Sequence, residues 1–155
     1  MWVGADTLDP PRPGSSVKPN LYNLDGVAYE SVMAGLFTII REDKPSNYPA
    51  RDKINNVCVG FSRDGFNWDR SNRDPIIGTS ENSTAWNYSN VQSAGGCFLT
   101  VGDQLFIYAS GRQTRTNSGG LTGVCSTGLA TMRRDGFASM EAGQQEGTLT
   151  TRPVE

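Results

Sequence analysis

The chain has 155 residues, the length of one domain, and a formal net charge of −2. This balance lacks the basic surface that binds nucleic acid or an anionic membrane, so we expect neither partner. The 18 glycines and 8 prolines separate short apolar runs, which predicts an all-β fold with almost no helix.

The sequence contains no histidine. This excludes Ser-His-Asp and Cys-His nucleophilic sites as well as zinc held by imidazole. Cys58, Cys97 and Cys125 each lie within an apolar strand pattern, and we interpret them as buried thiols rather than metal ligands. We therefore expect no metal and no cofactor, and any chemistry must use the remaining polar side chains.

No apolar stretch is long enough to cross a bilayer, and the N-terminus lacks the pattern of a signal peptide. We expect no membrane span. The residues alone leave the localisation unknown.

Residues 1–28 are predicted to form a loop, because the segment from Met1 to Asn23 is rich in proline, glycine and serine. Asp6 and Asp9 in this loop are either turn formers or the border of a binding site. A first strand is predicted over residues 29–40, which are apolar on both alternating faces and therefore interior to a sheet. Glu30, at the start of this strand, is either solvated or held at a site.

A β-hairpin is predicted over residues 57–70, which read V-C-V-G-F-S-R-D-G-F-N-W-D-R. An apolar run that stops at Asp64-Gly65 and resumes with aromatic residues is typical of a hairpin, because glycine adopts positive φ without steric cost. Asp64 is interpreted as a turn residue. The charged segment before this hairpin, residues 41–53, contains two prolines and is predicted to be an exposed loop.

The second half of the chain repeats this organisation. Residues 78–90 are polar and contain Trp86 and Tyr88, and a flexible loop is predicted over residues 114–120. Strands are predicted over residues 91–101, 104–110 and 123–133, with a short fourth strand over 138–141.

The Arg63-Asp64-Gly65-Phe66 turn recurs as Arg134-Asp135-Gly136-Phe137 in this second half. Repetition of one supersecondary unit at this scale is typical of arrays and β-propellers. Residues 29–77 and 78–143 are accordingly interpreted as two propeller blades, whose innermost strands line a channel. Residues 1–28 would then come from a preceding blade, and residues 144–155 would begin a following segment.

Several motifs together resemble the five-bladed β-propeller glycoside hydrolases, namely the family 32 N-terminal domain and its relatives in family 43. The motifs are Ser62-Arg63-Asp64-Gly65-x-x-Trp68, Tyr29-Glu30, Tyr108-Ala109-Ser110-Gly111-Arg112 and the run from Leu129 to Phe137. The resemblance implies a partial propeller of about two four-stranded antiparallel blades. It also implies secretion or a periplasmic location.

In such propellers, carboxylates that project into the central channel cleave a carbohydrate substrate, and Glu30 matches the position of the general acid. Glycoside hydrolysis needs two carboxyl groups, roughly 5 to 5.5 Å apart for retention and roughly 6.5 to 9.5 Å for inversion. The family's first-blade aspartate has no counterpart in this sequence. We therefore expect a fragment that is inactive alone and whose partners are the remaining blades of a parent chain.

Candidate substrate-binding residues accompany Glu30. They are Asp6, Asp9, Gln92, Trp86 and Arg112, with Trp2 and Tyr88 as further candidates for sugar contacts. Tryptophan and tyrosine at loop–strand junctions also serve as packing residues. The alternatives are a non-catalytic propeller that binds glycans or proteins, in which Glu30 only caps a strand, and a β-sandwich lectin.

Overall fold

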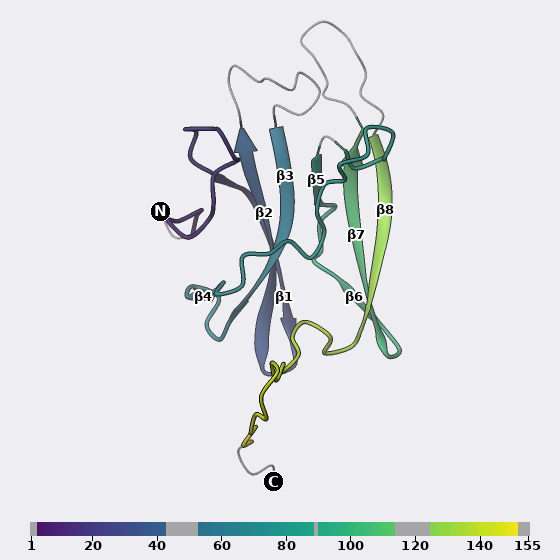
Figure 1. Ribbon diagram of the computed structural model, residues 1–155. Helices are drawn as coiled ribbons and strands as arrows, with labels where there is room; N and C mark the ends of the chain where they lie inside the picture. The colour runs from purple at the N-terminus through teal and green to yellow at the C-terminus, as the bar shows by residue number, and fades with distance from the viewer. Residues whose placement is uncertain (1–2, 43–52, 89, 114–124, 152–155) are drawn as a thin grey trace, which may run out of the picture.

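The computed structural model describes residues 3–42, 53–88, 90–113 and 125–151. Within these ranges the chain is all-β, with eight strands in two antiparallel sheets and no helix, as predicted (Figure 1). Trp2, the predicted loop 114–120 and most of the predicted loop 41–53 lie outside the described residues.

Sheet A contains β1 (Asn20–Tyr29), β2 (Val32–Glu42), β3 (Lys53–Ser62) and β4 (Trp68–Asp69), in that spatial order. β2 pairs along its length with β1 on one side and β3 on the other, so it is the interior strand that its apolar pattern predicts. β3 and β4 form the predicted hairpin around the first Arg-Asp-Gly-Phe turn.

Two predictions for the start of sheet A were wrong. Residues 20–28, predicted as loop, belong to β1, where a register shift between Leu21 and Asn23 breaks the alternation that would have indicated a strand. The predicted strand 29–40 is interrupted, because Tyr29 pairs with Val32 across a tight turn. This turn contains no glycine, and its Glu30 adopts a φ of 52°, a backbone conformation that favours glycine.

Sheet B contains β5 (Asn90–Ser93), β6 (Leu99–Val101), β7 (Gln104–Arg112) and β8 (Cys125–Arg133). β5 and β6 pair with the same edge of β7, and β8 pairs with its other edge. The strand predicted over 91–101 is therefore present only at its two ends. β7 and β8 confirm the other two predicted strands of this unit.

The predicted fourth strand over residues 138–141 is wrong, because these residues are exposed and have no strand structure. In sheet A, the equivalent strand begins with Trp68, whose ring packs against that of Phe37 at 5.3 Å. The corresponding position in sheet B is Ser139, which has no apolar surface to bury. The missing aromatic anchor explains why the second hairpin does not close in the same way.

The two sheets face each other across a common apolar core. Its buried members include Leu36 and Val57 from sheet A and Val91, Leu105 and Ile107 from sheet B. Both neighbouring propeller blades and β-sandwiches pack in this way.

The opposite face of β2 belongs to a second apolar cluster. In this cluster Phe37, Ile39 and Cys58 pack against other residues that include Val3 and Ala5. The N-terminal segment therefore covers the second face of sheet A.

The three thiols differ in burial. Cys58 and Cys97 are buried, as predicted, whereas Cys125 at the start of β8 is exposed, which corrects its predicted burial. By the β7–β8 register, Cys125 pairs with Arg112 at the sheet end, and this explains its exposure.

A tryptophan lies over glycines in each sheet. A Cβ atom on Gly35 would lie 2.5 Å from Cζ3 of Trp68, and one on Gly111 would lie 2.2 Å from Cζ3 of Trp86. Both distances are far shorter than a carbon–carbon contact, so these glycines make room for the indole rings. Trp86, a predicted sugar-stacking residue, thus uses part of its ring surface for packing.

Candidate functional site

The sequence-predicted site residues fall into three regions of the structure. Glu30 lies in the turn between β1 and β2, and Asp6 and Asp9 lie in the N-terminal segment on the outer face of sheet A. Gln92 and Arg112 belong to neighbouring strands of sheet B, and the third aromatic candidate, Tyr88, is half-buried in the turn before β5.

Glu30 lies at the opposite end of the sheets from the start of β5. The backbone N–H of Ser93 donates to Oγ1 of Thr38 (3.4 Å), and Sγ of Cys97 contacts the carbonyl oxygen of Ala34 (3.7 Å). Following β2 from Thr38 to Ala34 therefore leads toward Glu30 and away from β5. The structure does not bring the predicted general acid together with the sugar-binding candidates of sheet B.

Glu30 belongs to a cluster that joins the two sheets, the inter-sheet cluster of Tyr29, Glu30, Arg134 and Asp135. The Glu30 carboxylate, with its side chain 55% exposed, forms an ion pair with Arg134 of the second Arg-Asp-Gly-Phe turn. Figure 1 shows the chain after β8 crossing toward the end of the β1–β2 hairpin. A general acid needs a carboxyl that holds a proton, whereas this carboxylate is exposed and paired with a cation.

Tyr29 provides the second half of the inter-sheet cluster. Its hydroxyl donates to Oδ1 of Asp135 (2.5 Å) and accepts from the backbone N–H of Asp135 (3.1 Å). Asp135 adopts a φ of 60°, so each side of the contact contains one residue with a strained backbone, Glu30 in the first sheet and Asp135 in the second turn. The bonds across the contact hold both residues in place. The hydrogen bond to Asp135, followed by burial, raises the pKa of Tyr29 above its usual value of 10.0.

We predict that the inter-sheet cluster weakens at alkaline pH. Because the pKa of Tyr29 is raised on folding, its stabilising contribution is present below about pH 10 and is lost as the pH rises through the folded-state pKa. Urea unfolding between about pH 7 and pH 11 should show a steeper alkaline loss for the wild type than for Tyr29→Phe. The variant should already be less stable at neutral pH, and identical slopes would contradict the prediction.

Four aromatic rings surround the same contact. Phe137 of the second turn packs against Tyr29 and Phe61 of sheet A, with ring centroids 5.7 and 5.4 Å apart, and against Phe98, just before β6, at 5.6 Å. Edge-to-face packing, as in the first two of these pairs, adds to the stabilisation from burial. The second turn is therefore a joint between the sheets.

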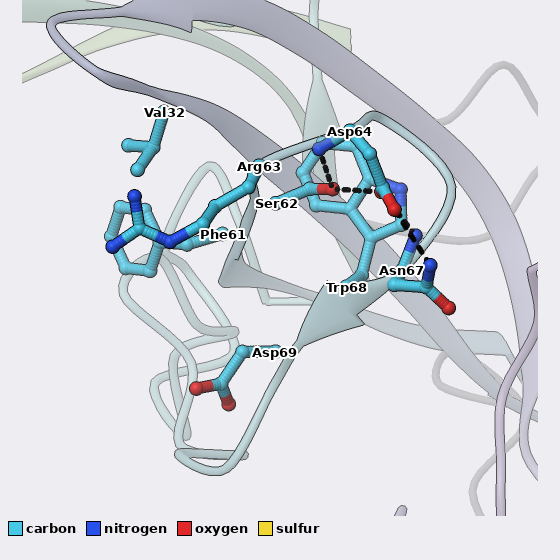
Figure 2. Close-up of a pocket in the computed structure, with 8 residues that line it drawn as sticks. All are labelled: Val32, Phe61, Ser62, Arg63, Asp64, Asn67, Trp68 and Asp69. Atoms are coloured by element: carbon cyan, nitrogen blue, oxygen red, sulfur yellow. Dashed lines mark hydrogen bonds between the residues drawn. The ribbon is translucent and has the colours of Figure 1, made fainter.

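The first turn is closed by its own side chains (Figure 2). Oδ1 of Asp64 accepts from the backbone N–H groups of Phe66 (2.8 Å) and Asn67 (2.7 Å), and Oγ of Ser62 accepts from the N–H of Gly65 (2.8 Å). The hydrogen bonds from Asn67 and Phe66 hold the pKa of Asp64 well below its usual value. Asp64 is thus fully used in shaping the turn, beside a pocket of about 490 Å³.

Asp9 is buried in an ion-pair network with two arginines. Arg70 donates to both of its carboxylate oxygens, at 2.6 and 3.2 Å, and the side chains of Asp9 and Arg70 are only 1% and 3% exposed. Arg73 lies 3.3 Å from Asp9 and also binds both oxygens of Asp6 at 3.0 Å. This network fastens the N-terminal segment to sheet A.

Asp6 differs from Asp9 because its side chain is 49% exposed. Partial burial opposes ionisation, but the hydrogen bonds from Arg73 and from the N–H of Leu8 outweigh it and lower the pKa of Asp6. Asp6 therefore presents a carboxylate anion to solvent.

Polar groups gather around Asp6 and Asp9 in a pocket of about 510 Å³. Besides the two carboxylates, its polar lining comprises Thr7, Ser15, Ser16 and Lys18. A second pocket of about 410 Å³ also contains Asp6 and is bordered by Phe66 and Trp68. The carboxylate of Asp6 and the hydroxyls of the first pocket can hydrogen-bond a hydroxyl-rich ligand, and the rings of the second pocket can stack against it.

Gln92 and Arg112 lie on one face of sheet B. Gln92 pairs with Ser110, which lies two positions before Arg112 on β7, so their side chains project from the same face. Trp86 packs over Gly111, which faces the other side of the sheet from Gln92 and Arg112. The structure therefore brings together Gln92 and Arg112 but separates them from Trp86.

The sequence reasoning missed the partners that hold the predicted acids. Arg134 and Asp135 carried a signal, because their turn repeats the first one. Arg70 and Arg73 carried none, since an ion pair between distant parts of the chain leaves no local pattern.

The described residues contain no group of three histidine, cysteine or acidic side chains placed to hold a metal ion. No helix in the described ranges is long and apolar enough to cross a membrane. No family model, curated protein or solved structure matches the chain.

Proposed function

We propose that this chain is a saccharide-binding part of a carbohydrate-active β-propeller of the glycoside hydrolase type. The blade interpretation is supported by two antiparallel sheets that share a core. An Arg-Asp-Gly-Phe turn follows β3 in sheet A and β8 in sheet B. The observation that carries the binding role is the open pocket that is lined by the half-exposed carboxylate of Asp6 together with hydroxyl groups.

The carboxylates with defined partners favour binding over cleavage by this chain. Glu30 pairs with Arg134, Asp9 with Arg70, and Asp64 with the N–H groups of its own turn. Acid–base chemistry on a glycosidic bond needs a carboxyl group free to exchange a proton. In this proposal, hydrolysis is an activity of the parent protein, and its catalytic carboxylates are completed by other blades.

The binding role predicts that the chain binds neutral oligosaccharides. Asp6→Asn should weaken this binding by about tenfold, because the substitution removes a charge-assisted hydrogen bond. Calorimetric titration with a panel of β- and α-linked gluco-, xylo- and fructo-oligosaccharides measures this. Asp74→Asn, at another exposed aspartate, is the matched control.

Aryl glycosides and fructans test the catalytic alternative in the same preparations. We expect no turnover by the wild type. Turnover that Glu30→Gln abolishes would establish Glu30 as the general acid and contradict the proposal, as would binding that Asp6→Asn leaves unchanged.

A further inference from the structure

The last strand, β8, forms one edge of sheet B. We infer that two copies of the chain associate through this edge, with their β8 strands paired antiparallel about a twofold axis. The two copies of sheet B then form one continuous sheet. This inference rests on the strand edge and is independent of sugar binding.

β8 pairs along one side only. Its register with β7 is unbroken from Gln104↔Arg133 to Arg112↔Cys125, and no other described strand pairs with it. Figure 1 shows β8 at the outer side of sheet B, and none of its residues is buried. The backbone N–H and C=O groups on its outer side can therefore pair with a further strand.

The other edges among the described strands are less suited to pairing. β4, β5 and β6 have two, four and three residues. β1 is long, but its register shifts between Leu21 and Asn23, and it carries the charge of Asp25. Bulges and charges are the features that keep edge strands from pairing. β8 has no register shift, and its charged residue, Arg133, is its last.

β8 also presents an apolar side chain to solvent. Leu129 lies opposite Tyr108 of β7, on the face of sheet B that points away from the common core, and these side chains are 50% and 42% exposed. The outer face of sheet A, in contrast, is covered by the N-terminal segment. Exposed apolar side chains beside an edge strand are typical of an interaction surface.

The residues of β8 suit a second β8 in the antiparallel orientation. A pairing centred on Leu129 places this residue opposite its own counterpart and places Thr127 opposite Thr131 of the partner subunit. Threonine pairs hydrogen-bond across neighbouring strands, and the leucine pair buries apolar surface. The edge is therefore complementary to itself, as a twofold interface requires.

Charge favours the antiparallel over the parallel orientation. A parallel pair in register would place Arg133 beside Arg133 of the partner subunit. The antiparallel pair centred on Leu129 separates the two arginines by roughly 27 Å, the length of eight strand steps, and salt screens charges at that distance. Each copy contributes one such edge, so association stops at the dimer.

Sedimentation equilibrium of the full chain tests the association. Between about 5 and 500 µM we expect a monomer–dimer equilibrium, weak because one strand pair is a small interface. Leu129→Lys places two like charges opposite each other and should weaken association at least about tenfold. Val101→Lys makes a matched change, because Val101 is 49% exposed on β6 at the other side of β7. This control should associate as the wild type does.

A mixture of two variants tests the register. Leu129→Lys and Leu129→Glu should each stay monomeric alone, and an equimolar mixture should form a heterodimer, because each charge then faces its opposite. Hydrogen exchange tests the wild type without substitution. The backbone amides of β8 should exchange more slowly at the high concentration than at the low one, and those of β1 should exchange equally at both.

The inference is overturned if the wild type stays monomeric at the highest concentration, if dimerisation protects another part of the chain instead of β8, or if the mixture fails to associate. Equal protection of β8 at both concentrations would also overturn it, because a segment of the same chain would then cover the edge. Oligosaccharide titration of the Leu129→Lys chain should match the wild type, which separates this outcome from that of the proposed function.

Discussion

Asp9→Asn is expected to lower the free energy of unfolding by about 3–5 kcal/mol, because it leaves the Arg70 guanidinium buried without its counter-charge. Asp9 accepts two hydrogen bonds from Arg70 and one from the N–H of Asp6 (2.9 Å). A loss of this size is a large share of the stability of an ordinary domain. Urea unfolding followed by circular dichroism measures it.

Asp6→Asn is the matched control for this experiment. Its ion pair with Arg73 is half exposed, so we expect a loss below about 1 kcal/mol. Equal effects of the two substitutions would show that the Asp9–Arg70 pair does not anchor the N-terminal segment as the structure indicates.

Phe37→Ala is expected to cost about 3–5 kcal/mol through lost burial and the cavity it leaves. Phe37 is fully buried, its ring meets that of Trp68 at 5.3 Å, and the guanidinium of Arg70 lies 4.6 Å from its centroid. The substitution therefore weakens both the second core cluster and the base of the Asp9 network. Unfolding by guanidinium chloride, monitored by tryptophan fluorescence, measures this change in the free energy of unfolding.

Phe66→Ala provides the comparison, since it removes the same side chain from an exposed position. We expect a change within about 0.5 kcal/mol. A large loss at Phe66 would contradict the small effect expected for a side chain that is 71% exposed.

The sequence predicts best where hydrophobic pattern and turn chemistry agree. The β3–β4 hairpin has both, as do β7 and β8. β1 has neither, because its bulge near Leu21 shifts the alternation and its residues include Asn20, Asn23 and Asp25. The β1–β2 turn is invisible in the sequence for a related reason: the contact of Glu30 with Arg134 compensates a backbone conformation that the turn's own residues do not favour.

The candidate site depends more on long-range contacts than the strands do. Proline-rich turns draw attention to Asp6 and Asp9 in the sequence, and in the structure both residues line the same pocket. Their ion pairs with Arg70 and Arg73 join distant parts of the chain, which a local motif cannot indicate. Glu30 shows the opposite case, since the position predicted as a strand start is an exposed turn.

One tryptophan packs on each sheet, so each sheet has its own fluorescent probe. Trp68 touches Gly35 in sheet A, and Trp86 touches Gly111 and Gly128 in sheet B. In a chain with Trp2 replaced by phenylalanine, the emission of these two rings would follow the separate halves of the protein during heating. Coincident transitions would mean that the halves melt as one cooperative body, and a split signal would mean that each half holds its structure independently.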